Sequence, residues 1–190
     1  MDEPQAISQL KQGDLTGLEF LVRQYQVKAI HTAYLVTGDP ALAEDLVQSA
    51  FLRLPHTIDQ FDDQRPFRPW FLRSVVNAAV KAAKRQQRSQ SLDEPTEAVI
   101  DWLLDTGPQP EALVETSELR QTVWSAIQQL TPEQRAVIVQ RHFLDMSEAE
   151  MVASFQRPAS TVKWWLHTAR NRLKNLLGAY RNEAENEHEE

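Results

Sequence analysis

The stretch SEAEMVASFQRPASTVKWWLHTARNRLKNLL, residues 147–177, predicts two helices joined by a tight turn. The second of these carries apolar residues in alternating steps of four and three, the spacing that directs one helical face towards a core. These residues are Val162, Leu166, Ala169, Leu173 and Leu176. The opposite face is basic and rich in hydrogen-bonding groups, so it remains free for a ligand. Its residues are Ser160, Lys163, Trp164, His167, Arg170, Asn171 and Lys174.

The turn before this basic helix indicates a helix-turn-helix. Ser147 and Glu150 form the signature of a capping box that begins a short first helix, and Pro158 prevents that helix from continuing. Gln156 stands where such turns usually have glycine. In a helix-turn-helix the second helix lies in the major groove, with its first residues on base edges. We therefore predict a DNA-binding surface; a helical hairpin whose basic face only meets solvent is the alternative.

Length and composition favour two small domains in a reducing compartment. The chain has 190 residues, of which 42% are hydrophobic, enough to give each of two domains its own core. It has no cysteine, which excludes disulfides and thiolate metal sites. No signal-like segment opens the chain, and no apolar run reaches the roughly 20 residues of a membrane span. We expect a cytoplasmic protein without a membrane span.

The net charge of −7 conceals an uneven distribution along the chain. Residues 76–90 hold four basic and no acidic residues, and residues 157–181 hold six basic and no acidic residues. Between them, residues 91–118 hold eight acidic residues and no basic one. Because local patches rather than net charge decide phosphate binding, the sequence predicts two candidate nucleic-acid surfaces.

Helical patterns account for the first 89 residues. Asp14 can begin a long helix that Gly38 ends, and Asp39 with Pro40 can begin a second helix that Pro55 is expected to stop. In that second helix we expect Leu42, Leu46 and Phe51 to face inward. A third helix, residues 67–88, should turn Phe71, Val75, Ala78 and Ala82 towards the core.

The opposite face of the third helix carries a basic stripe with one aromatic and one amide side chain. Its members are Trp70, Arg73, Asn77, Lys81, Lys84 and Arg88. Cations neutralise phosphates, and an exposed ring offers a base a surface on which to stack, so the stripe suits duplex edges or an unpaired strand. A basic face that only meets solvent, with Trp70 buried, is the alternative.

The remaining sequence predicts a linker, a second domain and a tail. Prolines and acidic residues mark the linker, in which the apolar residues 99–104 suggest a short docking helix. Helical patterns at 119–130 and 132–143, the latter begun by a capping box, complete a four-helix second domain with a helix-turn-helix. The expected organisation of this all-α chain is a first domain at 1–89, a linker at 90–115, a second domain at 116–181 and an acidic, disordered tail at 182–190.

With these elements placed, the chain resembles RNA polymerase sigma factors of the sigma-70 family, in the extracytoplasmic-function (ECF) group. The segment GDPALAEDLVQSAFLRL resembles the family's segment that grips the largest polymerase subunit, and FRPWFLRSVVNAAVKAAKR resembles its segment for the −10 promoter element. The segment LTPEQRAVIVQRHFLDMSEAEMVASFQRPASTVKWWLHTARNRLKNL resembles its −35-binding domain. Within it, TVK, LH and AR at 161–163, 166–167 and 169–170 carry the resemblance.

The resemblance implies a transcription initiation factor that binds core polymerase, directs it to −35 and −10 elements and assists promoter melting. Implied partners are core RNA polymerase, through its largest and flap-bearing subunits, promoter DNA and an anti-sigma factor. The polymerase contacts would be Asp45, Leu46, Gln48 and Phe51. The −10 contacts would be Phe67, Trp70, Arg73, Asn77, Lys81, Lys84 and Arg88, and the loop from Phe61 to Arg68 would help to hold an unpaired base. The −35 contacts would be Ser160, Thr161, Lys163, Trp164, His167, Arg170 and Asn171.

Other functional classes find less support in the residues. No catalytic constellation, glycine-rich phosphate loop or cofactor motif is evident, so neither an enzyme nor a cofactor is expected. The histidines lack metal-ligand spacing and predict no metal site: His31, His56, His142, His167 and His188. A stand-alone helix-turn-helix regulator is the second reading, and a pure interaction protein, such as one that sequesters a sigma factor, is the third.

Two finer expectations concern the free protein. Helical geometry puts Trp165 near the apolar row of its helix and Trp164 opposite it, so Trp165 should be partly buried and Trp164 exposed. The acidic linker between two basic surfaces should hold the domains together without a partner, and an anti-sigma factor could exploit that closed form.

Overall fold

In the computed structural model, every described element is a helix. The structure describes residues 1–89 and 113–187, and the side chains of residues 1–87 and 121–178. The elements in order are α1 (Glu3–Lys11), α2 (Thr16–Thr37), α3 (Pro40–Thr57), the 3-10 turn η1 (Ile58–Gln60), α4 (Phe67–Ser89), α5 (Leu113–Gln128), α6 (Pro132–His142), α7 (Glu148–Phe155) and α8 (Ala159–Glu187). The all-α prediction is confirmed. None of the described helices is long and apolar enough to cross a membrane.

Several helix boundaries follow from the residues that predicted them. Gly38 adopts φ 74° and ψ 5° after α2, a left-handed conformation that glycine reaches without steric cost. The Asp39 side chain accepts a hydrogen bond from the Leu42 amide at 3.0 Å, and Pro40 occupies the first turn of α3. Thr131 and Gln134 cap α6 reciprocally, as the capping box predicted.

Other boundaries differ from the predictions. Helix α1 was not predicted, although Asp2 and Gln5 form a capping box at its start. Pro55 does not stop α3, which continues to Thr57, because a proline so near the end removes only one of the last hydrogen bonds. Helix α5 begins at Leu113, inside the expected linker, and α8 continues through the expected disordered tail to Glu187. The predicted docking helix at 99–104 lies outside the described residues.

Aromatic rings between α2, α3 and α4 form part of the core of the first domain, together with aliphatic side chains. The Phe67 and Phe71 rings stack at 5.7 Å, and Phe51 meets Phe71 at 4.7 Å. The buried stripe of α4 continues through Ala79 and Ala83, whereas the predicted Ala78 and Ala82 are only half-buried. This difference in helical phase arises because α4 contacts α2 and α3 on one side and the second domain on another.

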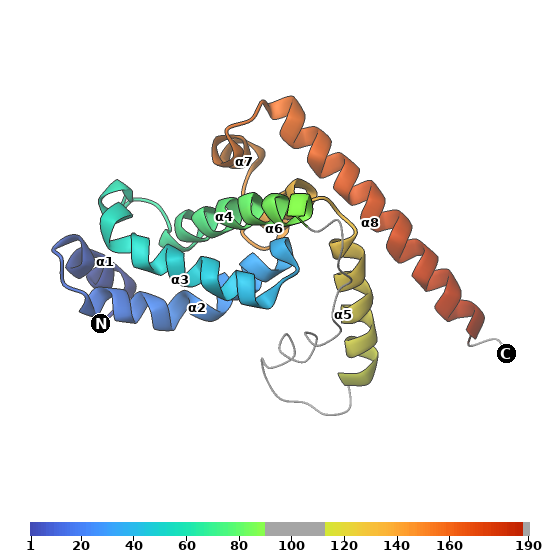
Figure 1. Ribbon diagram of the computed structural model, residues 1–190, viewed down its shortest axis with the longest axis horizontal. Coiled ribbons are helices and arrows are strands. Elements are labelled where there is room, and N and C mark those ends of the chain that lie inside the picture. The colour runs from blue at the N-terminus through green and yellow to red at the C-terminus, as the bar shows by residue number, and fades with distance from the viewer. Residues whose placement is uncertain (90–112, 188–190) are drawn as a thin grey trace.

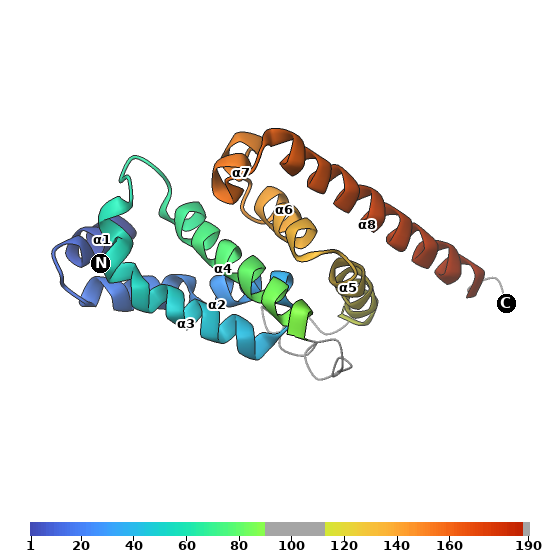
Figure 2. The same cartoon turned by 45° about the horizontal axis from the view of Figure 1, so that its top comes forward.

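The two domains lie against each other, with α6 between them. Figures 1 and 2 show α6 beside α4, and α8 running outward from the turn after α7 so that the C-terminal end of α8 lies far from α1. Helix α6 contacts α2 and α4 as well as α7 and α8. Every residue from Gln134 to Gln140 is buried, including the polar side chains of Gln134, Arg135 and Gln140. A helix buried on all sides by two domains is the structural centre of this closed arrangement.

Candidate nucleic-acid interface

The helix-turn-helix is formed by α7 and α8. The Ser147 hydroxyl accepts from the Glu150 amide at 3.3 Å, and the Ser147 amide donates to Glu150 Oε2 at 2.8 Å. The hydrogen bonds from the Ser147 hydroxyl and amide hold the pKa of Glu150 below its usual value. At the other end of α7, Gln156 adopts φ 51° and ψ 45°, the left-handed conformation expected at this turn. The turn geometry is therefore present without its usual glycine.

The predicted −35 residues lie on one exposed face of α8. Trp164 is 61% exposed, while Trp165 is half-buried with its ring edge-on to Phe155 at 5.6 Å, as helical geometry predicted. The amide of Asn171 lies 2.9 Å from His167 Nε2, and Lys163 forms an ion pair with Glu148 at 3.4 Å. The remaining predicted residues of this face are exposed except for one half-buried threonine: Ser160, Arg170 and Thr161. The face is open to a duplex.

The predicted −10 stripe follows α4, but its members differ in exposure. Lys81 is exposed, whereas Arg73, Asn77 and Lys84 are half-buried. Trp70 packs against the core, 5.2 Å from the Phe61 ring, so its exposure is partial. Arg88 lies in the last turn of α4, and its side chain is outside the described part.

Phe67 requires a correction. The prediction placed it among the −10 contacts, but its side chain is only 1% exposed and lies between the rings of Tyr25, Phe61 and Phe71. It begins α4, where the chain turns from the loop into the core, and a large apolar ring there is stabilised by burial. Phe67 is therefore an anchor of the loop and not a direct contact.

A small cavity lies beside the stripe, between α3, η1 and α4. Its volume is about 240 Å³. Its lining combines one aromatic ring with several hydrogen-bonding groups: Ala50, Leu54, Thr57, Gln60, Trp70, Phe71, Arg73, Ser74 and Asn77. Pockets for drug-sized ligands are roughly 300–1,000 Å³, so this one suits a smaller flat group such as a single nucleobase. Residues 61–66 connect η1 to α4 beside the cavity, and we refer to them, after their predicted role, as the −10 loop.

In this closed structure the second domain covers part of the −10 stripe. The side-chain amide of Asn77 donates to the backbone carbonyl of Ser154 at 3.2 Å, and the Ser154 hydroxyl donates to Asn77 Oδ1 at 3.3 Å. Gln140 in turn donates to the Ser154 hydroxyl at 2.9 Å, and Lys84 forms an ion pair with Glu133. A cleft of about 340 Å³ remains between the domains along this contact. Two residues predicted to bind DNA thus bind the second domain instead.

A second contact between the domains lies at the C-terminal end of α2. Tyr34 stacks on Trp124 of α5 with ring centroids 4.3 Å apart, and burial, with a smaller effect from the charge of Asp39, raises the pKa of Tyr34 to about 12. Arg135 lies near Gly38 and donates to Gln128 Oε1 at 2.5 Å. Burial lowers the pKa of its guanidinium to about 10, so Arg135 is still charged at neutral pH. The partial negative charge of the α2 C-terminus favours a cation at this position.

The predicted polymerase contacts lie on α3, with one correction. Asp45 and Gln48 are exposed and Leu46 is half-buried, but Phe51 is 6% exposed and packs against Phe71. Phe51 packs inward as expected. Its ring is therefore not free to contact polymerase directly. Leu52, which was not predicted, is 68% exposed on the same face as Asp45 and Gln48. Its exposure could have been inferred from its spacing of seven residues from Asp45.

The residues of the described part provide no other obvious chemistry. Among the described side chains, those of residues 1–87 and 121–178, no group of three or more histidine or acidic residues could hold a metal ion. His31 is half-buried in α2, and burial lowers its pKa. The arrangement as a whole presents two separate basic helical surfaces, one beside a base-sized cavity.

Comparison with known proteins agrees with this arrangement. Family models for Sigma-70 region 2 and Sigma-70 region 4 match residues 21–89 and 120–173, which contain α4 and the helix-turn-helix respectively. The ECF sigma factor SigW of Bacillus subtilis is 30% identical over 176 residues, which are 90% of this chain and 94% of SigW. The chain belongs to the ECF group of the sigma-70 family. Sigma factors are transcription initiation factors without enzymatic activity, so the non-enzyme prediction is confirmed.

Further relatives extend over both sigma regions. The ECF sigma-E factor of Escherichia coli K12 is 29% identical over 178 residues, covering 90% of this chain and 92% of that protein. Among solved structures, CnrH in complex with the cytosolic domain of CnrY has a TM-score of 0.59 at 23% identity and covers 93% of this chain and 97% of CnrH. RpoE of Bartonella quintana in complex with the anti-sigma factor NepR has a TM-score of 0.63 at 20% identity and covers 84% of this chain and 96% of RpoE. These two likenesses concern the fold.

Proposed function

We propose that this sigma factor binds core RNA polymerase, directs it to promoters with −35 and −10 elements, and assists strand separation at the −10 element. The observation that carries the proposal is the pair of basic helical surfaces on two separate domains, α8 with an open face and α4 with a cavity beside it. A factor of this kind works with polymerase in the cytoplasm.

The α8 face supports −35 recognition. A recognition helix contacts base edges with its first residues, and here the first two turns present Ser160, Lys163 and Trp164 to solvent. Lys163 can neutralise a phosphate or donate to guanine, and the Trp164 ring can contact a thymine methyl group. Thr161, His167, Arg170 and Asn171 complete the proposed contact set.

The α4 stripe and its cavity support capture of an unpaired −10 base. Trp70 offers a partly exposed ring, and Asn77, seven residues further along α4, lines the same cavity with a donor and an acceptor. Arg73, Lys81 and Lys84 would neutralise the backbone of the strand that carries the base. Arg88 remains in the proposed set on the resemblance alone.

The α3 face supports the polymerase contact. Asp45 and Gln48 are exposed polar groups on one side of α3, and Leu46, on a neighbouring side, is partly accessible. We add Leu52 because an exposed apolar side chain in the centre of a polar face suits the buried part of an interface. The flap-bearing subunit would contact the second domain.

An anti-sigma factor is the further partner that we propose. The sigma factor RpoE of Bartonella quintana was solved with the anti-sigma factor NepR, and CnrH was solved with the cytosolic domain of CnrY; both RpoE and CnrH share the fold of this chain. A partner that binds the closed form would keep the −10 stripe covered.

Run-off transcription tests the proposal. Core polymerase with this chain, on a pool of genomic fragments, should yield transcripts from specific start sites, and neither component alone should do so. A stand-alone regulator would instead bind its sites without polymerase. Lys81→Ala with Lys84→Ala should then reduce permanganate reactivity of −10 thymines and flatten the salt dependence of promoter binding, because fewer counterions are released. Equal reactivity in variant and parent would favour a basic face that only meets solvent.

A further inference from the structure

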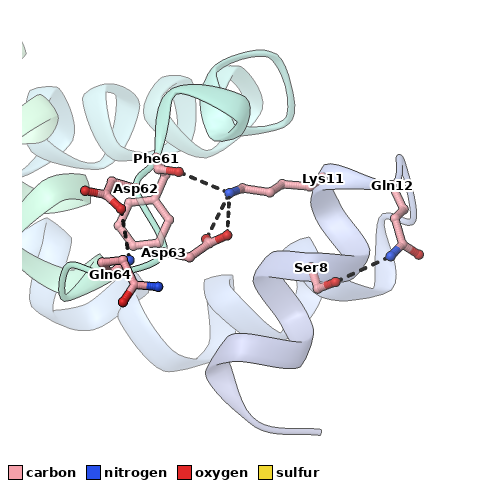
Figure 3. Close-up of polar contacts among 7 residues, drawn as sticks. All are labelled: Ser8, Lys11, Gln12, Phe61, Asp62, Asp63 and Gln64. Atoms are coloured by element: carbon pink, nitrogen blue, oxygen red, sulfur yellow. Dashed lines mark hydrogen bonds and ion pairs between the residues drawn. The ribbon is translucent and has the colours of Figure 1, made fainter.

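Lys11 joins α1 to the −10 loop (Figure 3). Its Nζ donates to the Phe61 carbonyl at 3.0 Å and to both carboxylate oxygens of Asp63 at 2.9 Å. The Lys11 side chain is 25% exposed, whereas the surface pair of Arg23 and Glu19 on α2 is 79% and 63% exposed. The three donors of one ammonium group are thus directed at two residues of the loop.

The residue that Lys11 holds lies next to the base-sized cavity. Phe61 is 4% exposed, and its ring contacts Phe67 edge-on at 5.4 Å and Trp70 at 5.2 Å. Trp70 and Gln60 line the cavity, and Gln60 directly precedes Phe61 in the chain. The Lys11 ammonium also lies 5.8 Å from the centre of the Phe61 ring, where a cation is attracted by the ring electrons. A movement of Phe61 would therefore change the wall of the cavity.

The same contact removes charge from a surface that must accept DNA. The loop contains two neighbouring carboxylates, Asp62 and Asp63, which would repel a phosphate backbone if they were unpaired. Asp62 forms an ion pair with Arg65 within the loop at 3.4 Å, and it accepts a hydrogen bond from the backbone amide of Gln64 at 3.0 Å. Asp63 pairs with Lys11. Each of the two carboxylates of the loop thus forms an ion pair with a basic side chain.

From these contacts we propose that Lys11 is a positioning residue for promoter melting: it holds the −10 loop so that the neighbouring cavity fits an unpaired base. The inference rests on the proposed function of the cavity. Lys11 itself is not among the residues that line the cavity, and α1 lies before the residues that match Sigma-70 region 2. Helix α1 is thus a support for −10 recognition, and Lys11 is the side chain through which it acts.

Open-complex formation by the holoenzyme tests this role. The templates are a promoter found by run-off transcription and a series in which single non-template −10 bases are replaced by abasic sites. We expect Lys11→Met to slow opening of the intact promoter about tenfold, the order expected for losing a charge-assisted hydrogen-bond cluster. On the template that lacks the captured base, the slowing should shrink to the smaller part that the unpaired Asp63 carboxylate causes on every template. Lys11→Arg should stay within about twofold of the parent, because it keeps the charge and the donors.

Two further variants complete the experiment. Arg23→Met is the matched control, since it breaks an exposed ion pair on α2, and it should behave as the parent does. Asp63→Asn leaves Lys11 and its bond to the Phe61 carbonyl in place, and we expect a slowing of about twofold to fivefold. Asp63→Asn also tests the positioning role if a thermal melt shows that Lys11→Met is unfolded.

The outcomes separate the positioning role from the proposed function. If Lys11→Met opens the intact promoter as fast as the parent, or is slowed equally on every abasic template, the positioning role is wrong. If Lys11→Met does not fold and the promoter opens at the parental rate with Asp63→Asn, the positioning role is wrong as well. If the parent itself is insensitive to all abasic sites, the proposed base capture fails and the positioning role fails with it.

Discussion

At the scale of single residues, the two tryptophans of α8 show how one helical step separates a structural role from a binding role. Trp164 and Trp165 are neighbours in sequence, but one is 61% exposed and the other packs against Phe155. Burial stabilises a ring in proportion to the area removed from water, whereas an exposed ring contributes little to the fold. Their substitutions should therefore differ in kind.

For this pair, Trp165→Ala should lower the free energy of unfolding by about 1–3 kcal/mol, below the 3–5 kcal/mol of a fully buried ring. Trp164→Ala should leave stability within about 0.5 kcal/mol of the parent and weaken −35 binding by the holoenzyme. Thermal melts and titrations with −35 duplexes measure the two effects. If Trp164→Ala unfolds the domain and Trp165→Ala only weakens binding, the proposed recognition face is wrong.

The turn residue Gln156 gives a second prediction. Its left-handed conformation costs a residue with a side chain roughly 1–2 kcal/mol, and glycine would relieve this cost at the expense of some backbone entropy. Gln156→Gly should therefore raise the free energy of unfolding by about 0.5–1 kcal/mol. Arg157→Gly is the control, because Arg157 is not among the residues with positive φ, and it should destabilise the protein. Chemical denaturation measures both effects. If Gln156→Gly proved less stable than Arg157→Gly, the explanation from the left-handed conformation would be wrong.

At the scale of helices, sequence patterns predicted the long helices but not α1, and they predicted less well which face each helix buries. The capping residues of α3, α6 and α7 predicted their starts, because caps act within a few residues. The phase of α4 was wrong by one residue at Ala78 and Ala82, since a second domain covers a face that the pattern assigned to solvent. Phe51 and Phe67 were misassigned for a related reason: a resemblance locates a motif but does not show which ring of it is buried.

The exposed face of α3 gives the prediction at this scale. Asp45→Arg should weaken the binding of core polymerase strongly if α3 meets a basic surface, because it replaces an attraction by a repulsion. Leu52→Asp should weaken binding as well, because a charge would enter the proposed apolar centre of the contact. Glu19→Arg on α2 reverses an exposed charge elsewhere and serves as the control. Pull-downs with core polymerase in which all variants bind like the parent would exclude α3 as the contact.

At the scale of the whole molecule, the closed arrangement could be foreseen only in outline. The charge pattern predicted domains held together by the acidic linker, but residues 90–112 lie outside the described residues, and the contacts that the structure shows are between the domains themselves. The pairs Asn77 with Ser154 and Lys84 with Glu133 join residues distant in sequence, which no local pattern encodes. The −35 face of α8 stays exposed in this form while the −10 stripe is partly covered.

The composition of the domain contact suggests that it is weak enough to open. Within the described residues, Arg135 Nε, Gln128 Nε2 and Gln140 Oε1 are buried without a hydrogen-bond partner. Each such atom costs roughly 1–3 kcal/mol, which offsets part of the stabilisation from the Tyr34–Trp124 stack and the Lys84 ion pair. A contact of this kind can yield when polymerase or DNA competes for the same residues.

Glu133→Lys should shift the free protein towards an open form, because it places a second positive charge beside Lys84. Glu148→Lys is the matched control: it also changes a first-turn glutamate paired with a lysine, but its partner Lys163 belongs to the same domain. Since the chain has no cysteine, a dye can be attached at Leu15→Cys, in the turn before α2, and a second dye at Asn175→Cys, on α8. Both positions are exposed. Energy transfer between the dyes should fall in Glu133→Lys and stay at the parental level in Glu148→Lys, with small-angle scattering showing a larger particle only for the former. Equal transfer in both variants would mean that the Lys84 pair does not hold the domains together, and the Tyr34–Trp124 contact would then be the one to disrupt.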